Sequence, residues 1–133
     1  MRRPRIAVCF CIAVLLLVSC AGEKPATSDI AAKPPDEAAA LAALKAINGA
    51  QADFIRRTRR YAQITNELIT DRLLSEEPSA EGYTIQLLPS ADAVSYTATA
   101  TPRTPGGKYF FTDKTGVIRV ETGKPATAES PAL

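Results

Sequence analysis

The spacing of apolar residues changes at Gly82, and this change constrains the fold more than any other feature of the sequence. Between residues 36 and 74 the apolar residues recur every three or four positions, which is the spacing of one face of a helix. After Gly82 they alternate, as in Tyr83-Thr84-Ile85-Gln86-Leu87, which is typical of a half-buried strand. The sequence therefore predicts helices followed by a sheet, which is an α+β fold.

Two helices are predicted before Gly82. Asp36 is expected to be the N-cap of a long helix over residues 36–61, which is rich in strong helix formers. Gly49 costs about 1 kcal/mol inside a helix, so we expect close packing or a slight bend there. A shorter helix is predicted over residues 65–74. The apolar face of the long helix is expected to hold Leu41, Leu44, Ile47 (or Asn48), Gln51, Phe54, Ile55 and Tyr61.

Short strands are predicted in the second half of the chain, joined by turns. Asp113-Lys114-Thr115-Gly116 has turn chemistry and predicts a hairpin between the last two strands. Sequential strands with short connections pair antiparallel, and only the long helix can cover one face of such a sheet. We predict one helix layer on three or four antiparallel strands over residues 36–122, with a flexible tail over 123–133. The expected strands are 83–87, 96–101, 109–112 and 117–120.

The first 20 residues have the layout of a bacterial lipoprotein signal. Three arginines in the first five residues precede an apolar run over residues 6–18, which is shorter than the roughly 20 residues that span a bilayer. Leu17-Val18-Ser19-Cys20 follows directly, and this order predicts cleavage before Cys20 and a lipid on its thiol. An ordinary signal peptide, in which Cys20 has no special role, is the alternative. Residues 1–19 are then removed, and residues 20–35 are predicted to be a disordered tether.

The composition of the mature chain excludes several kinds of metal and catalytic site. Three of the 16 basic residues lie in the predicted signal, which leaves 13 basic and 14 acidic residues and a net charge of −1. Cys9 and Cys11 would leave with the signal, Cys20 would carry lipid, and the sequence contains no His. Metal sites built on thiolate or imidazole and Ser-His-Asp or Cys-His catalysis are thereby excluded. We predict no catalytic residue, no cofactor and no metal, and hence a protein that is not an enzyme.

Several stretches resemble the globular domain of type IV pilin-like proteins (pseudopilins). The helical stretch over residues 37–51, EAAALAALKAINGAQ, resembles the exposed half of the pilin spine helix. Gly82-Tyr83-Thr84-Ile85 is similar to the entry of the first strand. The most specific part is YTATATP over residues 96–102, followed by YFFTDKTGVIR over residues 109–119, which resembles the final strands and hairpin. The resemblance covers about residues 36–120 and implies a pilin-like head.

The N-terminus departs from the pilin pattern. A prepilin has a short leader cut after Gly and then a long apolar helix, which anchors the protein and forms the filament core. Here the apolar run covers only residues 6–18 and is followed by Ser19 and Cys20, so the resemblance implies a head without the packing surface for a fibre. Our leading hypothesis is a lipid-anchored envelope protein that presents a protein-binding surface, for example to a pilus or a type II secretion-like assembly. Ala21 after the cysteine favours the outer over the inner membrane.

The densest charge cluster is Arg56-Arg57-Thr58-Arg59-Arg60 at the end of the predicted long helix. Four guanidinium groups are candidates for binding DNA, phosphate or an anionic surface. The competing interpretation is a solvated helix end, where cations favour the negative end of the helix dipole. We favour the solvated end and disfavour a nucleic-acid partner, because only Tyr61 offers an aromatic ring nearby.

The remaining candidates are aromatic and acidic. Phe110 and Phe111 are adjacent in a strand and must face opposite sides of the sheet, so one of them is a candidate partner contact on the outer face. Asp71 and three glutamates surround Pro78, and a solvated loop is favoured there over acid–base chemistry. Asp113 is one carboxylate in a short turn, which is inadequate for a calcium site.

Overall fold

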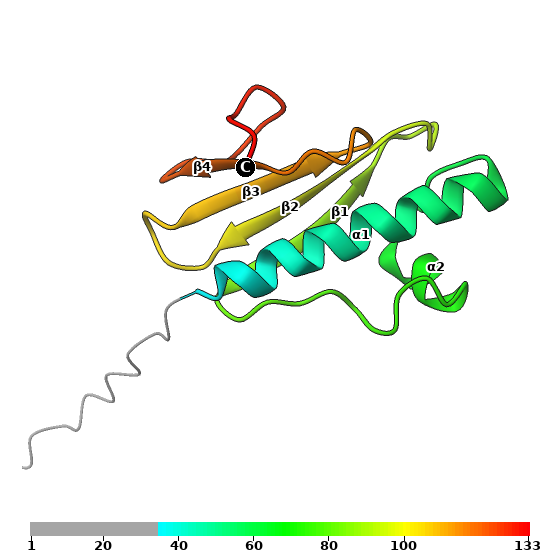
Figure 1. Ribbon diagram of the computed structural model, residues 1–133, viewed down its shortest axis with the longest axis horizontal. Helices are drawn as coiled ribbons and strands as arrows, with labels where there is room; N and C mark the ends of the chain where they lie inside the picture. Colours follow the sequence, from blue (N-terminus) through cyan, green and yellow to red (C-terminus); the bar gives the residue numbers. More distant parts are fainter. Residues whose placement is uncertain (1–34) are drawn as a thin grey trace, which may run out of the picture.

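The computed structural model describes residues 35–133, so the predicted signal, Cys20 and residues 20–34 of the predicted tether lie outside the described residues. The described chain forms helices α1 (Glu37–Thr58) and α2 (Thr65–Thr70). These precede strands β1 (Tyr83–Pro89), β2 (Tyr96–Pro102), β3 (Lys108–Asp113) and β4 (Arg119–Thr122). The predicted α+β class is confirmed, and α1 runs along one face of the sheet with α2 beside it (Figure 1).

Both helices end earlier than the apolar spacing predicts. The Asp36 side chain caps α1 by accepting a hydrogen bond from the Ala39 N–H at 2.9 Å, as expected. The helix stops at Thr58 because Arg59 takes a left-handed conformation with φ 65°, and its N–H donates to the Ile55 carbonyl. Arg72, with φ 58°, likewise follows the end of α2. A left-handed cap at Arg59 and a left-handed Arg72 directly after the cap of α2 could not be seen in the sequence, because a Cβ atom disfavours this conformation.

The four strands form an antiparallel sheet in the order β1-β2-β3-β4. The pairing places Ile85 opposite Ala100 and Ala100 opposite Phe110, so these side chains share the face that α1 covers. We call this the inner face, and the opposite side the outer face. The last strand begins at Arg119 rather than at Val117, two residues later than predicted.

Small residues allow α1 to approach the sheet closely. Ala40 on the helix and Ala98 and Ala100 on β2 are fully buried, around larger side chains such as Leu44 and Ile47. Of the predicted helix face, Leu44, Ile47, Gln51 and Phe54 are buried, Leu41 and Ile55 are half-buried, and Tyr61 lies beyond the end of α1.

Gly49 does not fulfil the role predicted for it. It is exposed, and a Cβ added there would meet no heavy atom within 4 Å. The expectation of close packing at Gly49 is therefore wrong. The neighbouring Asn48 instead faces the sheet.

Asn48 forms a polar link between α1 and the sheet. The Tyr96 hydroxyl donates to the Asn48 Oδ1 at 2.8 Å, and the Asn48 amide donates to the Thr112 hydroxyl at 2.9 Å and to the Gly116 carbonyl at 3.2 Å. Burial raises the pKa of the Tyr96 hydroxyl, which keeps it a neutral donor. This link fixes the helix against β2, β3 and the turn after β3.

The C-terminal segment, residues 123–133, returns to the sheet. The Val120 N–H donates to the Pro131 carbonyl, and the Leu133 N–H donates to the Ile118 carbonyl, both at 2.9 Å. Figure 1 shows this segment folding back over β4 on the side away from α1. The predicted flexible tail is therefore corrected, because the open side of β4 supplies backbone groups with which the last residues pair.

Candidate functional site

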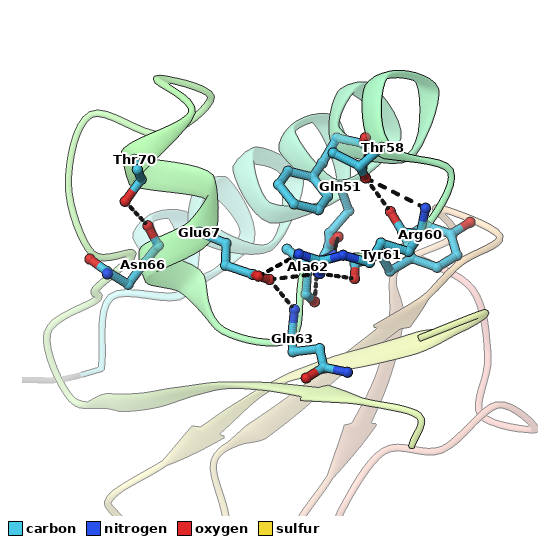
Figure 2. Close-up of polar contacts among 10 residues, drawn as sticks. Gln51, Thr58, Arg60, Tyr61, Ala62, Gln63, Asn66, Glu67 and Thr70 are labelled. Atoms are coloured by element: carbon cyan, nitrogen blue, oxygen red, sulfur yellow. Dashed lines mark hydrogen bonds and ion pairs between the residues drawn. The ribbon is translucent and has the colours of Figure 1, made fainter. Parts of the chain in front are cut away.

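The arginine cluster lies at the end of α1, and two of its four members are engaged locally. Arg56 Nη1 contacts the Asp53 carboxylate at 2.9 Å one helical turn earlier. The Arg60 guanidinium donates to both carboxylate oxygens of Glu67, at 2.6 and 3.1 Å, and lies 5.1 Å from the centre of the Phe54 ring. Arg60 therefore joins the end of α1 to α2 (Figure 2).

Glu67 completes this connection from α2. Its carboxylate also accepts a hydrogen bond from the Gln63 N–H at 2.7 Å (Figure 2). The hydrogen bond from Arg60 is the main cause that lowers the pKa of Glu67, so this carboxyl is ionised at neutral pH. The arrangement is a structural ion pair within the corner between the helices.

Gln51 holds the same corner from inside. Its side chain is fully buried, and its amide donates to the Ala62 carbonyl at 3.0 Å and accepts from the Ala62 N–H at 2.9 Å. Figure 2 draws this pairing together with the Arg60–Glu67 contact. The Gln51 amide thus satisfies both backbone groups of Ala62, as a neighbouring strand would. These two bonds hold the backbone at residue 62, two residues before Ile64.

The other two arginines of the cluster are Arg57 and Arg59. Both are exposed, and within residues 35–133 neither side chain makes an ion pair. The predicted four-arginine patch is therefore reduced to two separate cations beside Arg56 and Arg60, whose charges are already paired.

The two phenylalanines proposed as a partner contact are both buried. They do face opposite sides of the sheet, as predicted, with Phe110 in the core and Phe111 on the outer face. Phe111 is nevertheless only 9% exposed. Its neighbour on that face, Arg119, donates to the Ser130 carbonyl at 2.9 Å, so the C-terminal segment lies over this region. The prediction that one ring offers a partner contact is corrected for this reason.

The backbone of β1 is open along one side. The Arg103 N–H donates to the Gly82 carbonyl and the Ser90 N–H donates to the Ser95 carbonyl, so the even-numbered residues of β1 pair with β2. Ile85 and Leu87 consequently turn their N–H and C=O groups away from β2. Within residues 35–133, these groups have no hydrogen-bond partner. β1 is a sheet edge with donors and acceptors available.

A groove of about 280 Å³ with both polar and apolar side chains in its lining runs along this edge. Ile64, which follows the corner fixed by Gln51, is 57% exposed, and Leu88 on β1 is 53% exposed. The single charged residue of the groove is Glu77, which accepts a hydrogen bond from Thr65 at 2.5 Å. The edge therefore combines unpaired backbone groups with exposed apolar side chains, which is the chemistry of a protein contact.

These residues were not among the contacts predicted from the sequence. The signal for Leu88 was present, because Leu87 and Leu88 are adjacent in a strand and cannot both face the core. Ile64 had no such signal, since its exposure depends on where the corner after α1 places it. That β1 is an edge depends on the strand order, which no local pattern gives.

The acidic candidates of the sequence lie in exposed loops and turns. No group of three metal-ligating side chains occurs in residues 35–133, and no helix there is long and apolar enough to cross a membrane. Glu76, Glu77 and Glu81 are exposed in the loop before β1. Asp113 accepts from the Thr115 N–H at 2.8 Å and closes the turn as predicted.

Comparison with models of protein families, with curated proteins and with solved structures finds no match to this chain.

Proposed function

We propose that this chain is a non-enzymatic, lipid-anchored protein of the bacterial envelope whose pilin-like head binds protein at the open edge of β1. The observation that carries the proposal is the edge itself: unpaired backbone groups at Ile85 and Leu87 beside exposed Ile64 and Leu88. The long helix on an antiparallel sheet is the arrangement that the pilin resemblance implies, and it supports the proposed type of head.

Binding at such an edge occurs by strand addition. An extended segment aligned with β1 would pair with the N–H and C=O groups of Ile85 and Leu87, which provides affinity. Specificity would come from side chains that alternate between the groove and the outer face, where they meet Ile64 and Leu88 respectively. This mechanism requires no cofactor and no reacting group.

A lipid on Cys20 would tether this edge to the membrane through the start of the described chain. The Asp36 N–H donates to the Glu81 carbonyl at 2.9 Å, and Pro35 lies against Gly82, directly before β1. A lipid on Cys20, only 15 residues earlier, would hold the edge near the membrane and raise its local concentration for a membrane-bound partner. We propose the outer rather than the inner membrane, and an assembly such as a pilus or secretion system as the setting.

The alternative hypothesis, DNA or anionic-surface binding, is less well supported by the geometry. Arg56 and Arg60 already face the carboxylates of Asp53 and Glu67, which leaves Arg57 and Arg59 as free cations. Two exposed cations supply little of the phosphate neutralisation on which such binding depends.

Two measurements test the proposal. Mass spectrometry of the mature N-terminus should find lipid on Cys20, and an unmodified thiol or a retained residue 19 would refute the anchor. A photoreactive amino acid at Gln86, in the full chain in intact envelopes, should give a protein adduct. The matched control is Thr101, which is exposed on the same face but belongs to β2. Equal adduct from both positions would refute binding at the β1 edge.

A further inference from the structure

We propose that the partner strand at the β1 edge is basic: it presents a lysine or arginine to Glu77, two positions away from an apolar side chain that meets Ile64. This inference deepens the proposed function, on which it rests, by stating the chemistry of the partner. The partner is then an extended segment in which an apolar and a cationic residue share one face.

The groove beside β1 has two walls that come from different parts of the chain. One wall is the open strand edge over residues 85–88, and the other is formed by Ile64, Thr65 and Glu77. Figure 1 shows α2, which begins at Thr65, on the same side of the sheet as α1. A strand added to β1 would therefore turn every second side chain toward Ile64 and Glu77.

The second wall offers an apolar and an anionic contact at the spacing of a strand. The Glu77 carboxylate accepts a hydrogen bond from the Thr65 hydroxyl at 2.5 Å, so it lies beside the residue that follows Ile64. Alternate side chains of a strand are separated by about 7 Å. Two successive inward side chains of an added strand can thus meet Ile64 and Glu77 at once.

Glu77 has the capacity to bind a cation. Its Oε1 accepts from the Thr65 hydroxyl, and within residues 35–133 its Oε2 makes no hydrogen bond and no ion pair. The side chain is exposed, and it is the one charged group among the described residues that line the groove. The N–H groups of a lysine or arginine would give this carboxylate charge-assisted hydrogen bonds.

The segment that forms this wall is acidic as a whole. Residues 64–80 contain four acidic residues and one basic residue, whereas the rest of residues 35–133 contains eight acidic and ten basic residues. Of these four, only Glu67 has an ion-pair partner within the described chain. Negative charge therefore gathers on the segment beside the strand edge, where it attracts a basic partner and repels an acidic one.

A pair of capped peptides tests the inference. The peptide Thr-Ile-Thr-Lys-Thr-Ile-Thr places isoleucine and lysine on one face and reads the same in both directions, so it presupposes no strand polarity. Its match has glutamate in place of lysine. With the full chain in a non-ionic detergent, fluorescence anisotropy should show about tenfold tighter binding of the lysine peptide, because attraction to Glu77 replaces repulsion. This ratio should fall as salt is added.

Two charge variants decide whether Glu77 itself selects the peptide. Glu77→Lys should reverse the preference in favour of the glutamate peptide. The matched control is Glu76→Lys, which changes the net charge by the same amount at an exposed position that does not line this groove. Equal loss of the preference in both variants would assign it to overall charge and overturn the inference.

A third variant tests the apolar contact. Ile64→Ser should weaken the binding of both peptides alike, about fivefold, because both present isoleucine to this position. Unchanged affinity for both peptides would overturn the contact with Ile64.

The photoreactive group at Gln86 tests the same chemistry in intact envelopes. The segment that it captures should contain a lysine or arginine close to the cross-linked position. Capture of a segment without a basic residue, or of a second copy of this chain, would overturn the inference and leave binding at the edge.

The outcomes separate this inference from the proposed function. Equal affinity for the lysine and glutamate peptides rejects the basic partner alone, because strand addition still occurs. Absence of both peptide binding and adduct rejects the inference together with the proposed function.

Discussion

The two edges of the sheet, β1 and β4, differ in whether another part of the described chain pairs with them. At β4, the chain turns back on itself, and residues 131–133 pair with residues 118–120. At β1, the N–H and C=O groups of Ile85 and Leu87 that point away from β2 find no partner within residues 35–133, and the exposed Ile64 lies beside them in the groove. Within the described residues, the chain therefore closes one edge of its sheet with its own C-terminus and pairs no segment with the other.

The closing segment covers the outer face as well as the edge. The Ser130 hydroxyl donates to the Glu121 carboxylate at 3.1 Å, and the Ser130 carbonyl accepts from Arg119. Ala126 and Ser130 are buried, and so is Phe111 beside Arg119. The outer face therefore has buried residues beside β4, whereas the outer-face residues of β1, namely Thr84, Gln86 and Leu88, are exposed.

Removing residues 123–133 should have the largest effect, because it makes the two edges alike. Loss of the cover on Phe111 and of the backbone pairs with β4 should lower the free energy of unfolding by about 3 kcal/mol. Urea titration measures this loss, and light scattering should rise as the second edge opens. Ala128→Ser, at an exposed position of the same segment, is the control. An unchanged urea midpoint in the truncated chain would show that the segment contributes nothing.

The substitution Gln51→Leu should have the next largest effect, on the flank of the β1 edge. Leucine fills a similar volume but leaves the Ala62 N–H and C=O buried without partners. We expect a loss of about 2 kcal/mol in the free energy of unfolding, and faster amide exchange at residues 62–64. Gln63→Leu, at the exposed neighbouring position, should be nearly neutral. Equal effects of the two substitutions would mean that the Gln51 amide does not hold the corner.

The substitution Gly49→Ala should have a smaller and opposite effect, at an exposed position of α1. The new methyl group meets no atom within 4 Å, so only helix propensity changes. The free energy of unfolding should rise by about 0.5–1 kcal/mol, measured as a higher urea midpoint with the same dependence on urea. A destabilised variant would indicate that α1 needs the flexibility of glycine.

The smallest expected effect is the acid dependence of the Arg60–Glu67 ion pair beside the β1 flank. Because the folded pKa of Glu67 is lowered from its usual 4.5, the pair stabilises the fold above that pH. This contribution is lost as the pH falls below 4.5 and through the folded pKa. Glu67→Gln should therefore lower the thermal midpoint at neutral pH and match wild type in acid, whereas the exposed Glu76→Gln should be neutral throughout. A deficit of Glu67→Gln that persisted in acid would exclude an ionic origin.

Local patterns predicted most of the elements, and tertiary contacts adjusted their ends. Alternation located β1 and β2, and the turn at Asp113 was correct. The ends of α1 and α2 were missed because Arg59 and Arg72 adopt left-handed conformations that their residue type disfavours. β4 begins two residues later than predicted because its register is set by pairing with β3.

Candidate sites were harder to predict than elements. The arginine cluster was located correctly, but the carboxylate of Glu67, seven residues after Arg60, decides that Arg60 is a structural residue. Phe111 was expected as a contact because strand geometry alone places it on the outer face. The residues that cover it belong to a segment whose composition predicted a flexible tail.

The sequence by itself determined the α+β class and the antiparallel hairpins, since these depend on local periodicity, turn chemistry and residue type. It also predicts a signal over residues 1–19, which lies outside the described residues. Only the tertiary structure decided which strand has an open edge and which is closed by the C-terminus. Strand order and the return of a terminus to the sheet arise from contacts between residues distant in sequence, and no local pattern contains them.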